Sequence, residues 1–333
     1  MKKKLLFLIM IIGVFAISGC GKNSESDVIK DLTKKINDSK AYYVDGTLEI
    51  VNNEDVYTYN VNVSYKEKDN YKVSLVNTVN NHEQIILRNS DGVYVVTPRI
   101  NKSFKFQSEW PSNSSQSYIL ESLLKDVLND GERSVKNTND KYTIISKVNY
   151  PNNNDLKTQE VTLGSDYLPN KIVVKNSSGS TLISVVVTKI DLKTKYDKNY
   201  FALSNSIKEE VNNSSTKETG VTLKDVVYPM YLPSGTKYSG EEVITKDNSE
   251  RVILTYTGVK PFILIEEASN NKEHETTLVS GEVVQYGNVL GVLTSTSLNW
   301  SNNGKEYYLI GESLSSDEIL QIASSTATVA LTK

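Results

Sequence analysis

The feature that most constrains the fold of this 333-residue chain is an alternation of apolar and polar residues between positions 57 and 65. The apolar positions are Tyr57, Tyr59, Val61, Val63 and Tyr65. Side chains of a strand point alternately to its two faces, so this period of two predicts a strand with one buried face and one face in water. The alternation returns at residues 71–75 and predicts another such strand.

Turn-forming pairs separate further runs that are rich in β-branched residues. Asp91-Gly92 and Ser178-Gly179 each lie between two such runs, and Asn303-Gly304 has the same place near the C-terminus. Pairs of this kind are typical of two-stranded hairpins. We therefore expect mainly antiparallel β-structure.

One amphipathic helix, over residues 117–129, interrupts the β-rich region. Its apolar face carries Leu120, Leu123, Leu124, Val127 and Leu128, and its opposite face carries Glu121, Ser122, Lys125 and Asp126. The apolar face must bury against the sheet. It either forms a packed core or lines an apolar cleft, and the pattern leaves both open. A shorter helix is expected over residues 27–37, with Ser26 as its N-cap.

The chain begins like a bacterial secretory signal. Lys2, Lys3 and Lys4 precede a 13-residue apolar run, over residues 5–17, that is too short to be a comfortable membrane span. The following Ser18-Gly19-Cys20 resembles a lipobox. This resemblance implies that Cys20 is the first mature residue and carries a diacylglyceryl group on its sulfur, which would attach the protein to a membrane. The alternative is an ordinary signal peptide followed by an incidental cysteine.

Five segments make up the expected domain organisation. Residues 204–220 contain only two apolar residues and cannot support a core, so they predict a linker. The segments are a signal peptide (1–19), a lipidated tether (20–26), a first domain (27–203), the linker (204–220) and a small α+β domain (221–333). In the second domain, Ser315 and Glu318 have the spacing of a capping box that opens a helix.

The charge balance excludes some partners. The chain has 37 Lys+Arg and 40 Asp+Glu, and removal of the three signal lysines changes the net charge from -3 to 34 - 40 = -6. Nucleic-acid binding usually needs a strongly basic domain, so no nucleic acid is expected as a partner. Bulk charge also gives no attraction to anionic lipid headgroups, so membrane attachment would depend on Cys20.

The sequence predicts no enzyme. It has one cysteine, Cys20, and two distant histidines, His82 and His274. His274-Glu275 begins like a zinc-protease motif, but no second histidine follows at the required spacing. The sequence also lacks a Gly-x-Ser-x-Gly elbow and a phosphate-cradling glycine-rich loop. We expect no catalytic residue, no metal site and no cofactor; a hydrolase remains the least favoured hypothesis.

Two groups of stretches resemble a known family. Residues 87–98 and 166–174, the Gly179 hairpin and a strand ending near Phe201 resemble the LolA superfamily of lipoprotein carriers. Residues 229–235 and the helix at 314–324 resemble the small domain that follows LolA-like domains in RseB-type regulators and in YdcC-type sporulation lipoproteins.

This resemblance implies a mainly β (α+β) fold. The first domain would be an unclosed antiparallel β-barrel with helices in its concave face, and a small α+β domain would follow. LolA proper is soluble, so the expected lipid on Cys20 departs from it. The resemblance also implies a location at the outer face of the cytoplasmic membrane of a Gram-positive bacterium.

Two functional hypotheses follow. The first is a membrane-anchored extracytoplasmic lipoprotein that binds a lipid, a lipoprotein or another hydrophobic ligand as a carrier or sensor and signals to an extracytoplasmic protein partner. Its candidate ligand-lining residues are Leu120, Leu123, Leu124, Val127, Tyr57, Tyr59 and Val61. The alternative is a non-enzymatic structural or interaction lipoprotein of sporulation or germination, with a filled cavity. The cavity volume separates the two, because ligand pockets usually measure several hundred Å³.

Overall fold

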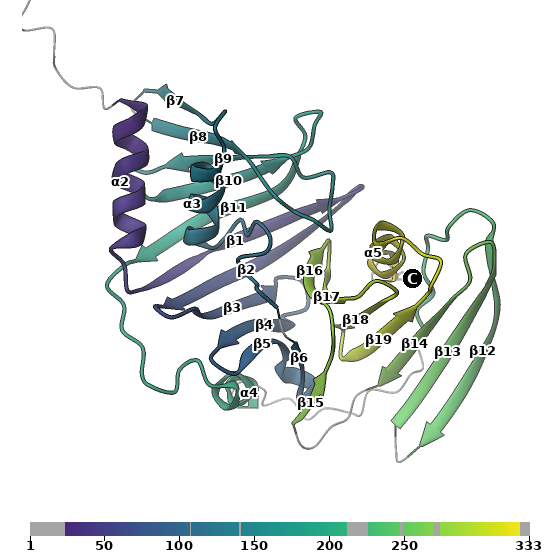
Figure 1. Cartoon of the computed structure of the whole chain (residues 1–333). Coiled ribbons are helices and arrows are strands. Elements are labelled where there is room, and N and C mark those ends of the chain that lie inside the picture. The colour runs from purple at the N-terminus through teal and green to yellow at the C-terminus, as the bar shows by residue number, and fades with distance from the viewer. Residues whose placement is uncertain are drawn as a thin grey trace, which may run out of the picture.

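The structure, a computed structural model, describes residues 24–106, 108–139, 141–211, 226–246, 249–268 and 274–326. The signal peptide, Cys20 and most of the expected linker lie outside these residues. The described chain forms two β-sheets with helices packed on them (Figure 1). This arrangement confirms the expected mainly β, α+β fold class.

The large sheet is unclosed. Within the described residues it has 12 strands in the order β15-β6-β5-β4-β3-β2-β1-β11-β10-β9-β8-β7. The strands are β1 (Ala41–Asn52), β2 (Asp55–Lys66), β3 (Asn70–Asn77), β4 (Glu83–Asn89), β5 (Gly92–Thr97), β6 (Lys102–Phe106), β7 (Ser134–Thr138), β8 (Lys141–Lys147), β9 (Thr158–Leu163), β10 (Pro169–Lys175), β11 (Thr181–Asp191) and β15 (Glu275–Leu278). The alternating segment 57–65 lies in β2, and the Gly92 and Gly179 turns join β4 to β5 and β10 to β11, as predicted.

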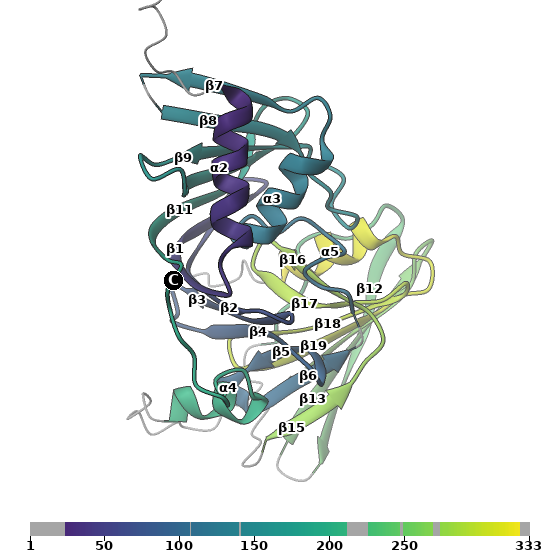
Figure 2. The same ribbon diagram turned by 60° about the vertical axis from the view of Figure 1, so that its left-hand side comes forward.

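The concave face of this sheet carries the helices α2 (Glu25–Asn37) and α3 (Leu120–Asn129) (Figure 2). The N-cap of α2 is Ser24, and the prediction of Ser26 is wrong. Ser24 is favoured because the Asp27 side chain accepts a hydrogen bond from its backbone N–H, which completes a capping box. The helix therefore takes up residues 25 and 26, and the chain available as a tether is shorter than expected.

A third helix, α4 (Leu203–Val211), begins one residue before the predicted linker (204–220) and includes its first eight residues. It packs on the opposite, convex face, where Leu203 and Ile207 join a small cluster with Ile85, Leu87 and Phe201. Two apolar side chains suffice to dock one short helix on an exposed sheet face, which explains why the composition did not reveal it. The short 3-10 turn η2 (Pro98–Ile100) lies near α4.

The second unit is a sheet of seven strands, counted over the described residues, with one helix packed against it. Its elements are β12 (Thr236–Lys246), β13 (Ser249–Gly258), β14 (Phe262–Ala268), β16 (Glu282–Tyr286), β17 (Val289–Leu293), β18 (Ser297–Asn302), β19 (Lys305–Ile310) and α5 (Ser316–Ser325). Ser315 caps α5 and forms the predicted capping box with Glu318.

The two units are interleaved. β15 comes from the second unit but pairs in parallel with β6 at the edge of the large sheet. Leu290 and Val292 of β17 are buried in the same apolar cluster as α2, α3 and the central strands of the first unit. The second unit therefore completes the core of the first.

We predict that Leu290→Ala destabilises the whole protein by about 2–5 kcal/mol, because it leaves a cavity between the units. Leu290 is only 3% exposed. The matched control is Leu278→Ala on β15, where the leucine is 77% exposed and the expected loss is under about 0.5 kcal/mol. Urea unfolding monitored by circular dichroism measures both. An equal, small effect of the two substitutions would contradict the interleaved core.

Candidate functional site

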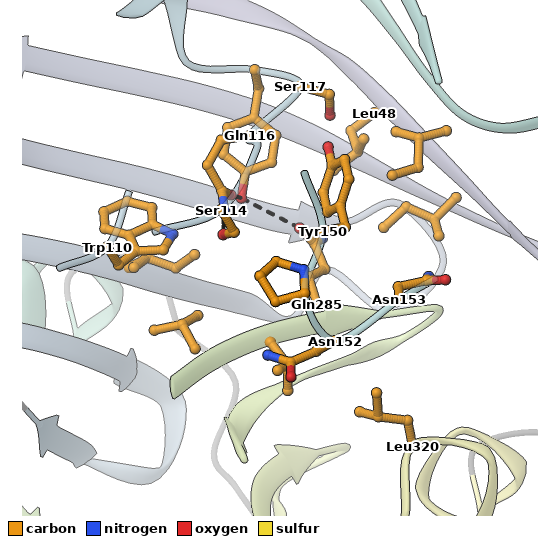
Figure 3. Close-up of a pocket in the computed structure, with 17 residues that line it drawn as sticks. Leu48, Trp110, Ser114, Gln116, Ser117, Tyr150, Asn152, Asn153, Gln285 and Leu320 are labelled. Atoms are coloured by element: carbon orange, nitrogen blue, oxygen red, sulfur yellow. Dashed lines mark hydrogen bonds between the residues drawn. The ribbon is translucent and has the colours of Figure 1, made fainter. Parts of the chain in front are cut away.

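A partly enclosed cavity lies at the junction of the two units (Figure 3). Its volume is about 60 Å³. Leu48, Ile50 and Trp110 of the first unit form part of its wall, and Gln285 and Leu320 of the second unit close it. Such a volume holds about two water molecules, whereas ligand pockets usually begin near 300 Å³.

The concave face is filled by the chain itself. Leu120, Leu123, Leu124 and Val127 of α3 are 1%, 2%, 4% and 0% exposed. They belong to one apolar cluster with Val61 and Tyr59 of β2, while Tyr57 packs against its margin half-buried. The seven candidate ligand-lining residues thus share one packed core, and none of them lines the 60 Å³ cavity. Tyr59 lines a second, smaller cavity between the units, of about 20 Å³. Their role in ligand binding stays a prediction.

A buried ion pair joins the units. Lys102 of β6 contacts Glu306 of β19, and both side chains are less than 10% exposed. Lys102 Nζ also donates to the Tyr308 hydroxyl at 2.9 Å, and that hydroxyl donates to Glu306 at 2.5 Å. Burial and the neighbouring Glu306 raise the pKa of Tyr308, so the hydroxyl keeps its proton. The sequence could not reveal this pair, because its members lie 204 residues apart.

Further hydrogen bonds cross the junction around the loop between β6 and α3. Glu282 of β16 accepts from Ser108 Oγ at 2.6 Å and from Asn113 Nδ2 at 2.5 Å. Gln84 Nε2 donates to the backbone oxygen of Leu290 at 3.3 Å. The Trp110 indole N–H is buried and finds no partner among the described residues. The bonds of Ser108 and Asn113 to Glu282 hold this loop against the second unit.

The two histidines lie apart and make separate side-chain contacts. His274 Nε2 lies 3.0 Å from Ser103 Oγ and helps join β15 to β6. His82 contacts Arg99, and burial together with that cation lowers the pKa of His82 to about 4. The described residues contain no group of three His, Cys, Asp or Glu side chains that could hold a metal ion. In the same part of the chain, no helix is long and apolar enough to cross a membrane.

Two acids on the polar face of α3 are half-buried. Tyr42 Oη donates to the Glu121 carboxylate at 2.5 Å, yet burial outweighs this bond and raises the pKa of Glu121 to about 7. Burial also raises the pKa of Asp126 to about 6. Helical periodicity identified this face as polar. It could not show that the Tyr42 side chain and the loop before α3 cover part of it.

We predict that Lys102→Met destabilises the protein by about 3–5 kcal/mol, because Glu306 is left as an unpaired buried charge. The double variant Lys102→Met/Glu306→Leu should recover most of this loss, since it removes both charges. Thermal and urea unfolding test both. A loss below about 1 kcal/mol for the single variant would contradict the burial of the pair.

We predict that Glu121 makes the protein less stable as pH rises. The folded pKa of about 7 lies above the reference value of 4.5, so between these values the folded state binds more protons than the unfolded state. The stability that this provides is complete below about pH 4.5 and is lost as pH rises through about 7. Between pH 4.5 and 8 this group should lower the free energy of unfolding by about 2–3 kcal/mol. Glu121→Gln should remove this decrease, which urea unfolding across the same pH range measures.

The control for this experiment is Glu132→Gln, at an acid whose side chain is 80% exposed. This substitution should leave the pH slope unchanged. An unchanged slope in Glu121→Gln as well would contradict the assignment.

Comparison with known proteins gives one strong family match. The family model described as "Sporulation protein YdcC-like" matches residues 1–201. The sporulation protein YdcC of Bacillus subtilis (strain 168) is 33% identical over 326 residues, which cover 97% of this chain and 96% of that protein.

Solved structures give weaker likenesses. MucB is 13% identical, with 92% of this chain and 98% of that chain covered and a TM-score of 0.32. The LolA superfamily protein NE2245 of Nitrosomonas europaea is 9% identical, with 55% of this chain and 99% of that chain covered and a TM-score of 0.32. These scores are too low to establish the fold, which comes from the strand order described above.

Proposed function

The chain belongs to the family of YdcC-like sporulation proteins, and from this premise we propose that it is a non-enzymatic interaction lipoprotein of sporulation, attached through Cys20 to the outer face of the cytoplasmic membrane. In this proposal its folded body binds an extracytoplasmic protein partner and does not carry a lipid. The alternative, a carrier of hydrophobic ligands, requires an open concave face.

The filled concave face favours the interaction role over the carrier role. A carrier needs a space of several hundred Å³, and the junction cavity measures about 60 Å³. To open the face, the four buried side chains of α3 would have to leave the core. Exposing them costs roughly 1.5–3 kcal/mol each, or about 6–12 kcal/mol together. That is as large as the whole stability of an ordinary domain, so the packed state supports the interaction role.

The proposed membrane attachment rests on the lipobox and on the position of α2. Only three residues separate Cys20 from Ser24, the N-cap of α2. Fully extended, this segment spans at most roughly 14 Å. A lipid on Cys20 would therefore hold the folded body against the membrane surface.

Native mass spectrometry of a form lacking residues 1–20 tests the interaction role against the carrier role. We expect the mass of the polypeptide alone, and the same mass after incubation with fatty acid or with a lipidated peptide. Crosslinking of the full chain in sporulating cells should give a discrete protein adduct. Stoichiometric lipid on the purified protein would instead favour the carrier.

We predict that Cys20→Ser abolishes lipidation and removes the covalent membrane anchor, which weakens membrane attachment, because the hydroxyl cannot form the thioether to diacylglycerol. Cell fractionation and incorporation of labelled palmitate measure this. Ser18→Ala, which leaves the cysteine intact, is the control and should stay in the membrane fraction. Unchanged palmitate labelling and membrane recovery of Cys20→Ser would contradict the anchor.

A further inference from the structure

Residues of α2, the C-terminal end of α3 and β7 line an open groove. These three elements lie side by side in Figure 2. Its volume is about 760 Å³, more than ten times that of the junction cavity. Ile29, Leu128 and Val135 give it an apolar side, and Lys30, Lys34 and Arg133 add three cations. The groove plays no part in the junction between the two units.

The periodicity of the two helices explains why this groove combines apolar and basic side chains. α2 buries Val28, Leu32 and Ile36 in the core. Residues 29, 30, 33 and 34 therefore lie along the flank of the helix and face the groove. Leu128 continues the apolar pattern of α3, but at the end of the helix it is 46% exposed. β7, the edge strand of the large sheet, is itself mostly exposed, so it covers little of the Leu128 side chain.

The groove lies beside the point from which the chain leads to the lipidation site. Glu25 and Ser26, the first two residues of α2, are at its margin. Since Cys20 lies within roughly 14 Å of Ser24, a lipid on Cys20 brings the groove to the bilayer surface. This step rests on the proposed function, because it requires the anchor at Cys20.

The charge of the groove is opposite to that of the mature chain. Lys30, Lys34 and Arg133 face one acid, Glu25, whereas the mature chain as a whole carries -6. The neighbouring acid Glu132 pairs with Lys147 at 2.7 Å. A local basic cluster beside one exposed and two half-buried apolar side chains matches the interface of a bilayer, where anionic phosphates lie next to acyl chains.

We propose that this groove is a membrane-docking surface that contacts an anionic phospholipid in the leaflet in which Cys20 is anchored, without removing that lipid from the bilayer. The basic side chains contact the headgroup phosphate, and Ile29, Leu128 and Val135 contact the upper part of the acyl chains. Docking then gives the anchored protein a fixed orientation on the membrane.

Vesicle binding by the unlipidated chain tests the groove without the anchor. A form lacking residues 1–20 keeps every described residue. It should cosediment with phosphatidylcholine vesicles containing phosphatidylglycerol, and less with pure phosphatidylcholine or at high salt. Lys30→Glu/Lys34→Glu should weaken binding at least about tenfold. Lys195→Glu/Lys198→Glu, the same charge change at two exposed lysines on the loop before α4, should leave binding unchanged.

Equal losses in the two double variants, or no preference for phosphatidylglycerol, would overturn the proposal. These outcomes do not depend on acylation, so they are distinct from a failure of the Cys20 anchor, which would appear as loss of palmitate labelling.

Site-specific labelling of the anchored chain tests the orientation. Cys20 is the only cysteine in the sequence, so a polarity-sensitive fluorophore on Leu128→Cys reports one position once Cys20 is acylated. In vesicles containing phosphatidylglycerol its emission should shift to the blue and resist an aqueous quencher. The matched label at Val243→Cys on β12, also an exposed apolar position, should remain quenchable. Equal quenching of both, or protection of Leu128 in cells but not in vesicles, would overturn docking to lipid.

Discussion

The packing of β17 and α3 into the concave face of the large sheet is the interaction on which the rest of the structure depends. An unclosed sheet has an apolar face that must be covered, since exposed apolar surface is unfavourable in water. Here α3 covers the centre and Leu290 and Val292 extend the same core from the second unit. The small junction cavity, the buried Lys102–Glu306 pair and the parallel pairing of β15 with β6 all follow from this closure.

Local patterns predicted the parts of the fold that local chemistry determines. The alternation in β2, the hairpin at Gly92, the amphipathic α3 and the capping box of α5 were all correct, because each depends on neighbouring residues. The sequence did not predict contacts that depend on distant segments. α4 docks through two apolar side chains, Lys102 meets a partner on the other unit, and the burial of Glu121 results from tertiary packing. For the same reason helical periodicity could not decide between core and cleft.

The two ends of the molecule differ in character. The N-terminal end of α2 and β7 lie at one end, and β12 and β13 of the second unit lie away from them (Figures 1 and 2). An anchor at Cys20 and the basic groove would place the first end on the membrane and direct the second unit outward. The exposed apolar side chains of that unit, which include Val243 and Ile263, would then face an extracytoplasmic partner. Rigid closure between the units would keep this surface at a constant height above the bilayer.

Amide hydrogen exchange of β17, compared with β2, tests the closed junction most directly. Residues 289–293 should exchange as slowly as residues 61–65, because both strands belong to one core that opens only by global unfolding. Fast exchange of β17 while β2 remains protected would contradict the account. It would mean that the second unit leaves the concave face in the native state and that the first unit opens as a ligand carrier would.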